Sequence, residues 1–212
     1  MGKIYPEIDS ELATWIGRQH VAFVGTAPSR DDGHVNVSPK GISKTFVIRG
    51  PREVAYLDLF GSGIETVAHL KDNGRIVLMF CAFEGRPRTI RLHGSGEVVE
   101  QGDVRYPALR SEFNLPEEWA AAVRAIIRVD VTRIADSCGF TVPLMAYRGE
   151  RSQLLDTAQA WVAKGGPEAI RDYCDINNAR SIDGLTALEP LYDAASGRPR
   201  ARTARSHEGR AL

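Results

Sequence analysis

The chain has 212 residues, of which 43% are hydrophobic and 25% are charged, as in an ordinary globular protein. Its 27 Lys and Arg residues balance 27 Asp and Glu residues, so charge gives no reason to expect nucleic acid or an anionic membrane as a partner. We expect neither a membrane span nor a secretory signal, because no apolar run approaches the ~20 residues that cross a bilayer.

The three cysteines, Cys81, Cys138 and Cys174, are widely spaced and form no Cys-x-x-Cys pair. An odd number without a disulfide framework favours reduced thiols, so we expect a cytoplasmic protein. The five histidines show no metal-binding spacing, and we expect no metal site. A reactive Cys138 would need a partner base, and the sequence identifies none.

The first predicted element is a helix over Asp9–Arg18, with Leu12, Trp15 and Ile16 on one face. Short β-branched runs follow in pairs around turn signals such as Asp32-Gly33 and Gly50-Pro51. The predicted pairs are 20–26 with 34–40, 45–49 with 53–58, and 75–83 with 88–100. Successive hairpins predict an antiparallel sheet, closed into a barrel that leaves no edge.

Helices are predicted over Ser62–Lys71, Pro116–Ile127, Glu150–Lys164 and Pro167–Asn177, and a last strand over 128–134. The chain from Arg198 to Arg210 carries five arginines and one acid with nothing to bury. We therefore expect a barrel domain over residues 1–148, a helical extension packed on it over 149–190, and a disordered Arg-rich tail over 191–212.

The turn Gly61-Ser62-Gly63 leads into a predicted helix. Glycines let backbone N–H groups approach a phosphate, and the helix dipole favours an anion there, with the Thr66 hydroxyl one turn inside. The competing interpretation is a capping box, in which Ser62 occupies those N–H groups and Glu65 repels an anion.

Polar residues also alternate on two predicted strands. Asn36, Ser38 and Lys40 share one face, which indicates either a ligand site or a solvent face. Arg91 and Thr89 share a face of a later strand, with Arg88 opposite; their guanidinium groups suit phosphate oxygens or an electron-rich ring edge, or are surface charges.

Seven short segments in this order resemble the pyridoxamine 5′-phosphate oxidase-like, FMN-binding split-barrel family, in particular a bacterial and fungal branch of it. The segments are His34-Val-Asn-Val-Ser-Pro-Lys-Gly41, Tyr56-Leu-Asp58, Gly61-Ser-Gly-Ile-Glu-Thr-Val-Ala-His69, Asn73-Gly-Arg-Ile-Val-Leu-Met-Phe80, Arg88-Thr-Ile-Arg-Leu-His-Gly94, Asp136-Ser-Cys-Gly-Phe-Thr-Val-Pro-Leu-Met145 and Asn178-x-x-Ser-Ile-Asp-Gly-Leu185. They extend over roughly residues 5–185.

The resemblance implies a mainly β (α+β) fold, a six-stranded antiparallel Greek-key split β-barrel with flanking helices and a helical C-terminal extension. It also implies a homodimer with FMN in clefts between the subunits. The strand over Val35–Lys40 would contact the flavin ring and ribityl chain, and the turn and helix after Leu57-Asp58 would hold the phosphate. The cofactor-binding residues predicted in this way are Asn36, Val37, Ser38, Lys40, Leu57, Asp58, Ser62, Gly63, Thr66, Arg88, Thr89 and Arg91.

Several residues depart from the oxidase pattern. Val35 stands where the oxidase has a phosphate-binding arginine, and Ile64-Glu65-Thr66 stands where it has a basic Ser-Arg-Lys run. The C-terminal Trp and Arg that complete the oxidase site have no clear counterpart. These departures argue against pyridoxamine phosphate oxidation and leave the phosphate to hydroxyls and amides.

The sequence thus predicts a flavin-dependent oxidoreductase acting on a small molecule, and it identifies no catalytic acid or base. The alternative is a non-catalytic protein that carries haem, a deazaflavin or a B6 vitamer, since relatives in the wider superfamily bind such groups. A third interpretation gives the tail or the C-terminal helices a surface for another protein.

Overall fold

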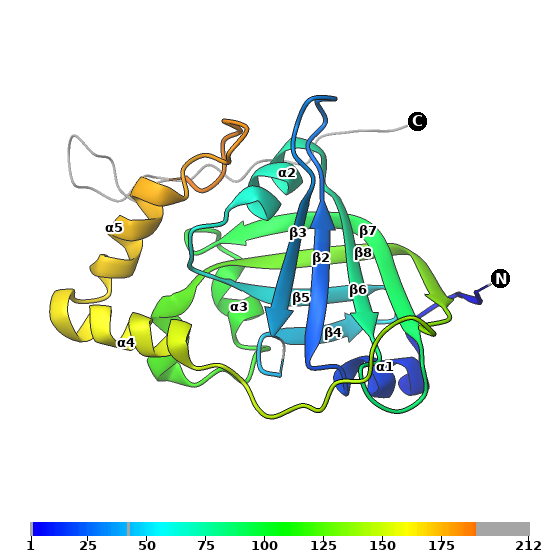
Figure 1. The fold of residues 1–212 in the computed structure, drawn as a ribbon. Helices are drawn as coiled ribbons and strands as arrows, with labels where there is room; N and C mark the ends of the chain where they lie inside the picture. The colour runs from blue at the N-terminus through cyan, green and yellow to red at the C-terminus, as the bar shows by residue number, and fades with distance from the viewer. Residues whose placement is uncertain (1, 42, 190–212) are drawn as a thin grey trace.

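A curled antiparallel sheet forms the centre of the protein (Figure 1). The structure is a computed structural model that describes residues 2–41 and 43–189. The strands are β1 (Ile4–Tyr5), β2 (Val21–Thr26), β3 (Asn36–Gly41), β4 (Phe46–Gly50), β5 (Glu53–Leu59), β6 (Arg75–Cys81), β7 (Thr89–Glu100) and β8 (Val123–Ser137). Their order is β3-β2-β6-β7-β8-β5-β4, and β1 pairs with β8.

The predicted fold class is confirmed as a mainly β, antiparallel half-barrel flanked by helices. The ordered path holds seven strands rather than six, and the described strand pairs leave β3 and β4 as its edges, so backbone hydrogen bonds do not close the barrel. The short strand β1 adds a further pairing, Ile4 with Ala135 and Tyr5 with Ile134, that no alternation in the sequence marks.

Alternation along the strands places the main core on the inner face of the sheet. Ala22 and Val24 of β2 and Leu78 and Phe80 of β6 all lie in this core. A second core lies on the opposite face of β5 and β8, under α3 (Tyr106–Arg110) and the chain that follows it. Residues that alternate with the main core therefore face outward or into the second core.

Two helices lie at opposite ends of the sheet in Figure 1, α1 (Ser10–Gly17) and α2 (Glu65–Asn73). The helix α1 confirms the first prediction: Asp9 caps it, and its carboxylate accepts a 2.8 Å hydrogen bond from the Leu12 N–H. The helix α2 begins three residues later than predicted, at Glu65 instead of Ser62.

The helix predicted over Pro116–Ile127 is wrong in its second half. Only the 3₁₀ helix η1 (Glu117–Ala122) forms, and β8 begins at Val123. The Ala-rich composition favours a helix locally, but this stretch pairs with β5 from Val123 to Asp130 and with β7 from Ala125 onward. These two rows of cross-strand contacts override the intrinsic preference.

The C-terminal extension contains α4 (Gln153–Gly165) and α5 (Glu168–Asn177), as predicted, followed by a segment over 178–189 that returns to α2 (Figure 1). Phe60, directly after β5, packs against Trp161 of α4 in a tilted contact and against Tyr173 of α5 edge to face, which anchors both helices on the sheet domain. The division into separate units stays a prediction, and the Arg-rich tail lies outside the described residues. Within residues 2–41 and 43–189, no helix has the length and apolar character needed to span a bilayer.

Candidate functional site

The predicted polar face of β3 turns inward, toward α2. Asn36, Ser38 and Lys40 pair in register with Thr26, Val24 and Ala22 of β2, and directly paired residues share a face. The Asn36 amide donates a 3.0 Å hydrogen bond to the Thr66 hydroxyl, and the Ser38 hydroxyl donates one of 3.2 Å to Asn36 Oδ1. The structure thus brings three of the predicted cofactor-binding residues into one hydrogen-bonded group.

Lys40 continues this face into a buried group of charges. Its Nζ lies 3.0 Å from Oδ1 of Asp58, and Nε of Arg124 lies 2.7 Å from Oδ2 of the same carboxylate. Desolvation would raise the pKa of Asp58, but the charges of Lys40 and Arg124 outweigh it and hold that pKa below its usual value. Asp58 is therefore ionised at neutral pH, and it forms ion pairs with both Lys40 and Arg124.

Arg124 also fixes the glycine turn, a role that the sequence did not predict. Its guanidinium donates to the carbonyl oxygens of Gly61 and Gly63 at 3.2 and 2.6 Å. It donates as well to Oδ1 of Asn178, whose amide in turn donates to the Gly61 oxygen at 2.9 Å. The turn therefore directs carbonyl groups, which are acceptors, at the buried cation.

The start of α2 differs from the predicted capping box. Ile64 is the N-cap residue, and Oε2 of Glu65 accepts a 3.0 Å hydrogen bond from the Ile64 N–H. Ser62 lies outside the helix, so it is free of the capping role that we considered. The competing capping-box interpretation is wrong because the helix begins after the glycine turn instead of within it.

A pocket opens at this point between β3, the glycine turn and the C-terminal extension. Its lining residues are His34, Val35, Asn36, Ser62, Gly63, Glu65 and Ile182. Asn36, Ser62 and Gly63 were predicted as cofactor-binding residues, and Thr66 stands directly behind Asn36. The pocket combines amide and hydroxyl groups with one carboxylate, and none of its lining residues is Lys or Arg.

Asp183 lies beside this pocket and binds the lining residue His34, a contact that the sequence did not predict. Its two carboxylate oxygens accept hydrogen bonds from the His34 backbone N–H at 2.9 Å and from His34 Nδ1 at 2.7 Å. These bonds lower the pKa of Asp183, so it carries a negative charge at neutral pH. The contact joins residues that are 149 positions apart in the sequence, which no local pattern indicates.

The other predicted residues lie elsewhere. Arg88 donates to the Tyr5 hydroxyl at 2.5 Å and stacks over Trp15, at the α1 end of the molecule. Arg91 alternates with the core residues Ile90 and Leu92, so it lies on the outer face. Thr89 is buried beside Cys81, Leu57 belongs to the second core, and Val37 is 64% exposed on the outer face.

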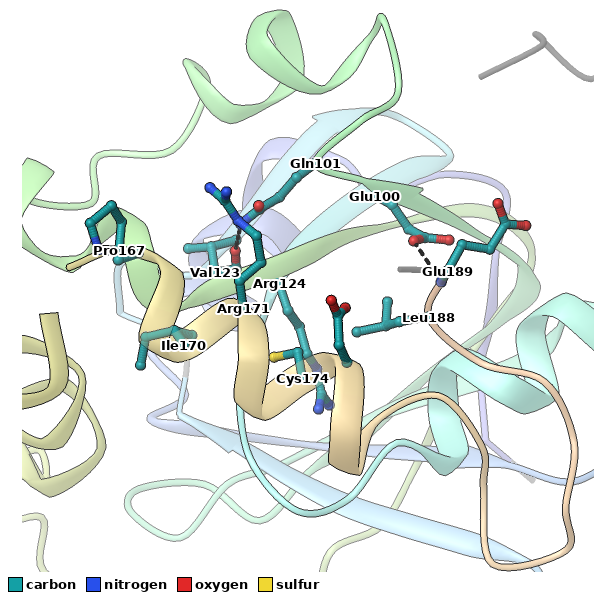
Figure 2. A pocket seen from close by; sticks show the side chains of 12 residues that line it. Glu100, Gln101, Val123, Arg124, Pro167, Ile170, Arg171, Cys174, Leu188 and Glu189 are labelled. Carbon is teal, nitrogen blue, oxygen red and sulfur yellow. Dashed lines mark hydrogen bonds between the residues drawn. The ribbon is translucent and has the colours of Figure 1, made fainter. Parts of the chain in front are cut away.

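A second pocket lies between α5, η1 and the end of β7 (Figure 2). In this view Cys174 of α5 lies beside Arg124, Ile170 projects from α5 on the left, and Glu100 and Leu188 lie to the right of Arg124. The backbone N–H of Glu189 donates to Oε2 of Glu100 at 3.2 Å, which ties the end of the C-terminal extension to β7. Arg124 thus stands between the two pockets.

No group of three or more His, Cys, Asp and Glu side chains is placed to hold a metal ion in the part of the chain that the structure describes.

Two buried polar atoms near the first pocket have no hydrogen-bond partner. They are the Tyr56 hydroxyl oxygen and Nε2 of His69. Tyr56 lies under Lys40, and His69 Nδ1 shares a hydrogen bond of 3.0 Å with the Thr26 hydroxyl.

Comparison with known proteins identifies relatives over most of the chain. A family model for pyridoxamine 5′-phosphate oxidase matches residues 8–138. UstO of Aspergillus flavus, a pyridoxamine 5′-phosphate oxidase family protein, is 36% identical over 197 residues, which cover 87% of this chain and 77% of UstO.

Two solved structures show lower similarity. HupZ of group A Streptococcus is 24% identical with a TM-score of 0.46, and the match covers 60% of this chain and 91% of HupZ. The FAD binding protein of Mycobacterium smegmatis is 17% identical with a TM-score of 0.42, over 64% of this chain and 96% of that protein. On the family model and the UstO match, this chain belongs to the pyridoxamine 5′-phosphate oxidase family.

Proposed function

We propose that this protein binds a flavin in the pocket between β3, the glycine turn and the C-terminal extension, and that it acts as a flavin-dependent oxidoreductase on a small molecule. When bound, a flavin supplies hydride or single-electron transfer, while the protein holds and orients it. The observation that carries the proposal is the convergence of Asn36, Ser62 and Gly63 on one pocket in a chain of this family.

The donors and acceptors of the pocket fit the neutral parts of a flavin. The Ser62 hydroxyl can exchange hydrogen bonds with ring carbonyls and with the hydroxyls of the ribityl chain. The Asn36 NH2 group is engaged by Thr66 and Thr26, and its Oδ1 keeps one lone pair for a ring N–H or a ribityl hydroxyl. Thr66 and Ser38 fix the orientation of Asn36 through bonds of 3.0 and 3.2 Å. A side chain held from two sides is ready to bind without further ordering.

The phosphate of FMN, the flavin that the family resemblance implies, does not fit the same pocket. Glu65 lines it and Asp183 lies beside it, and the cations Lys40 and Arg124 are engaged by Asp58. A phosphate would therefore meet carboxylates instead of the basic side chains that normally bind it.

We also propose a cytoplasmic homodimer. Val35 and Val37, at the sheet edge formed by β3, are 74% and 64% exposed, and exposed aliphatic residues beside a candidate site favour contact with another chain. A second copy over this edge would cover the pocket from solvent. Sedimentation of the purified protein tests this part of the proposal. We expect a dimer, and a monomer at micromolar concentration would contradict it.

The experiment begins with the absorbance spectrum of the protein as purified, followed by fluorescence titration with flavin. We expect saturable binding of one flavin per chain. Asn36→Leu should weaken it by about tenfold or more, because it leaves polar flavin atoms without a partner. The control, Asn114→Leu, removes an exposed amide outside the pocket and should bind as the wild type does.

Turnover is tested by mixing the flavin-loaded protein with NADH or NADPH without oxygen. Loss of the oxidised flavin absorbance supports an oxidoreductase. Retention of that absorbance with every reductant supports a carrier, and a Soret band in the purified protein supports haem binding instead. A colourless protein that binds no added flavin contradicts the proposal.

A further inference from the structure

The start of α2 already holds a carboxylate where an external anion would bind. Oε2 of Glu65 accepts the hydrogen bond from the Ile64 N–H at 3.0 Å. Oε1 lies 3.4 Å from the backbone nitrogen of Ile182 in the C-terminal extension. The N–H groups at the start of a helix have no partner within the helix and can bind an anion. Here Glu65 supplies that anion from within the chain.

The C-terminal extension adds a second carboxylate to the same place. Asp183 is one residue beyond the pocket-lining Ile182, and the hydrogen bonds from His34 hold its carboxylate at the start of the segment leading into β3. Asn178 fixes the beginning of this segment through its bonds to Arg124 and Gly61. The position of Asp183 is therefore set by its own bonds to His34 and by the anchoring of Asn178 earlier in the segment.

The described cations near these two charges are already engaged, and Asp183 itself is paired with His34 and lies near Arg30. Lys40 and Arg124 share the buried carboxylate of Asp58. Arg30, which donates to the Asp183 carbonyl oxygen, forms a bidentate pair with Asp32. A phosphate that entered this pocket would be repelled by Glu65 and Asp183, and like charges at short range in a partly enclosed site interact strongly.

We propose that Glu65 and Asp183 determine the specificity of this pocket and that it selects against a phosphate monoester. This inference rests on the proposed flavin binding. The preferred ligand is a flavin whose ribityl chain ends in a free hydroxyl, as in riboflavin. A carboxylate repels a phosphate but not an uncharged polyol chain, so Glu65 and Asp183 would exclude FMN and leave riboflavin free to bind.

The test compares riboflavin with FMN in fluorescence titrations of the full chain. Wild-type protein should bind riboflavin at least about tenfold more tightly than FMN. Added salt should strengthen FMN binding by screening the repulsion and leave riboflavin binding unchanged. An FMN affinity equal to or higher than that of riboflavin would overturn the inference.

Charge-removing variants then identify the residues. Glu65→Gln keeps an oxygen for the Ile64 N–H and should raise FMN affinity by about tenfold, with riboflavin affinity changed less than about threefold; Asp183→Asn should act in the same direction. Glu7→Gln removes an exposed carboxylate near the N-terminus and serves as the matched control. If FMN binds but none of these variants changes its affinity, the inference is wrong while flavin binding stands; if neither flavin binds wild-type protein, flavin binding itself is wrong.

Discussion

The carboxylate of Asp58 accepts a 2.7 Å hydrogen bond from Nε of Arg124, and the two side chains are 0% and 6% exposed. Asp58 lies at the end of β5 and Arg124 at the start of β8, where the strand register shifts. Because Arg124 also binds the Gly61 and Gly63 carbonyl oxygens, this pair sets the position of the glycine turn relative to the sheet.

Replacing Asp58 by Asn should strongly destabilise the protein. The variant leaves the Arg124 and Lys40 charges buried without a counter-charge, and breaking a buried pair in this way costs about 3–5 kcal/mol. Urea unfolding measures the change. Asp130→Asn is the control, since Asp130 pairs with Arg128 at the surface with 63% of its side chain exposed, and its loss should cost less than about 1 kcal/mol. Equal effects of the two variants would show that the buried pair contributes no more than a surface pair.

Asn178→Ala should release the C-terminal extension from the pocket. The buried Asn178 side chain joins Gly61 to Arg124, and its removal takes one hydrogen bond from each of them, at a cost of about 1–3 kcal/mol. Hydrogen exchange should quicken in residues 178–188 and in the glycine turn. The control is Asn177→Ala, whose exposed side chain donates to the Tyr173 carbonyl oxygen of its own helix. Unchanged exchange in Asn178→Ala would mean that other contacts hold the segment.

The three cysteines should differ sharply in reactivity. Cys138 is exposed, whereas Cys81 and Cys174 are each 6% exposed. Burial raises the pKa of Cys174 to about 11, which leaves little of the reactive thiolate at pH 8. A thiol reagent such as DTNB should modify one cysteine rapidly in the folded protein, and Cys138→Ser should abolish this fast phase. A fast phase that persists in Cys138→Ser would contradict the burial of the other two.

Stability should fall as the pH drops below about 6.5, partly through His69. Desolvation lowers the pKa of this fully buried side chain, so the unfolded chain binds a proton more readily than the folded one. The contribution of neutral His69 to the free energy of unfolding is complete above the pKa of the unfolded chain. It is lost as the pH falls toward the lower pKa of the folded protein, and over this range the free energy of unfolding falls by at most about 1.4 kcal/mol per pH unit. His69→Gln should reduce this slope in unfolding measured at several pH values. His20→Gln, at an exposed position, should keep it, and an unchanged slope in His69→Gln would exclude His69 as its source.

The sequence predicted those parts of the fold that depend on local patterns. Alternating β-branched residues located most of the strands. Asp9 indicated the start of the first helix, which it caps. Residues 123–127 were misassigned because their composition favours a helix while their pairing with β5 and β7 is non-local. Strand β1 was missed because its two residues, Ile4 and Tyr5, are too few to show an alternation.

The candidate site was predicted only in part for a similar reason. Asn36, Ser38 and Lys40 were correctly placed on one strand face, but the sequence left open whether that face meets solvent or a ligand. Arg124 and Asp183 were missed, since each gains its role from residues more than 60 positions away. Glu65 was read as part of a capping box, and only the helix start shows that its carboxylate lies over Ile64.

A crystal structure of the protein soaked with riboflavin tests the central claim most directly. The account predicts that the ribityl chain lies within hydrogen-bond distance of Asn36 and Ser62, with its end toward Glu65. A flavin bound instead on the outer face beside Arg91, or at the α1 end beside Arg88, would contradict it.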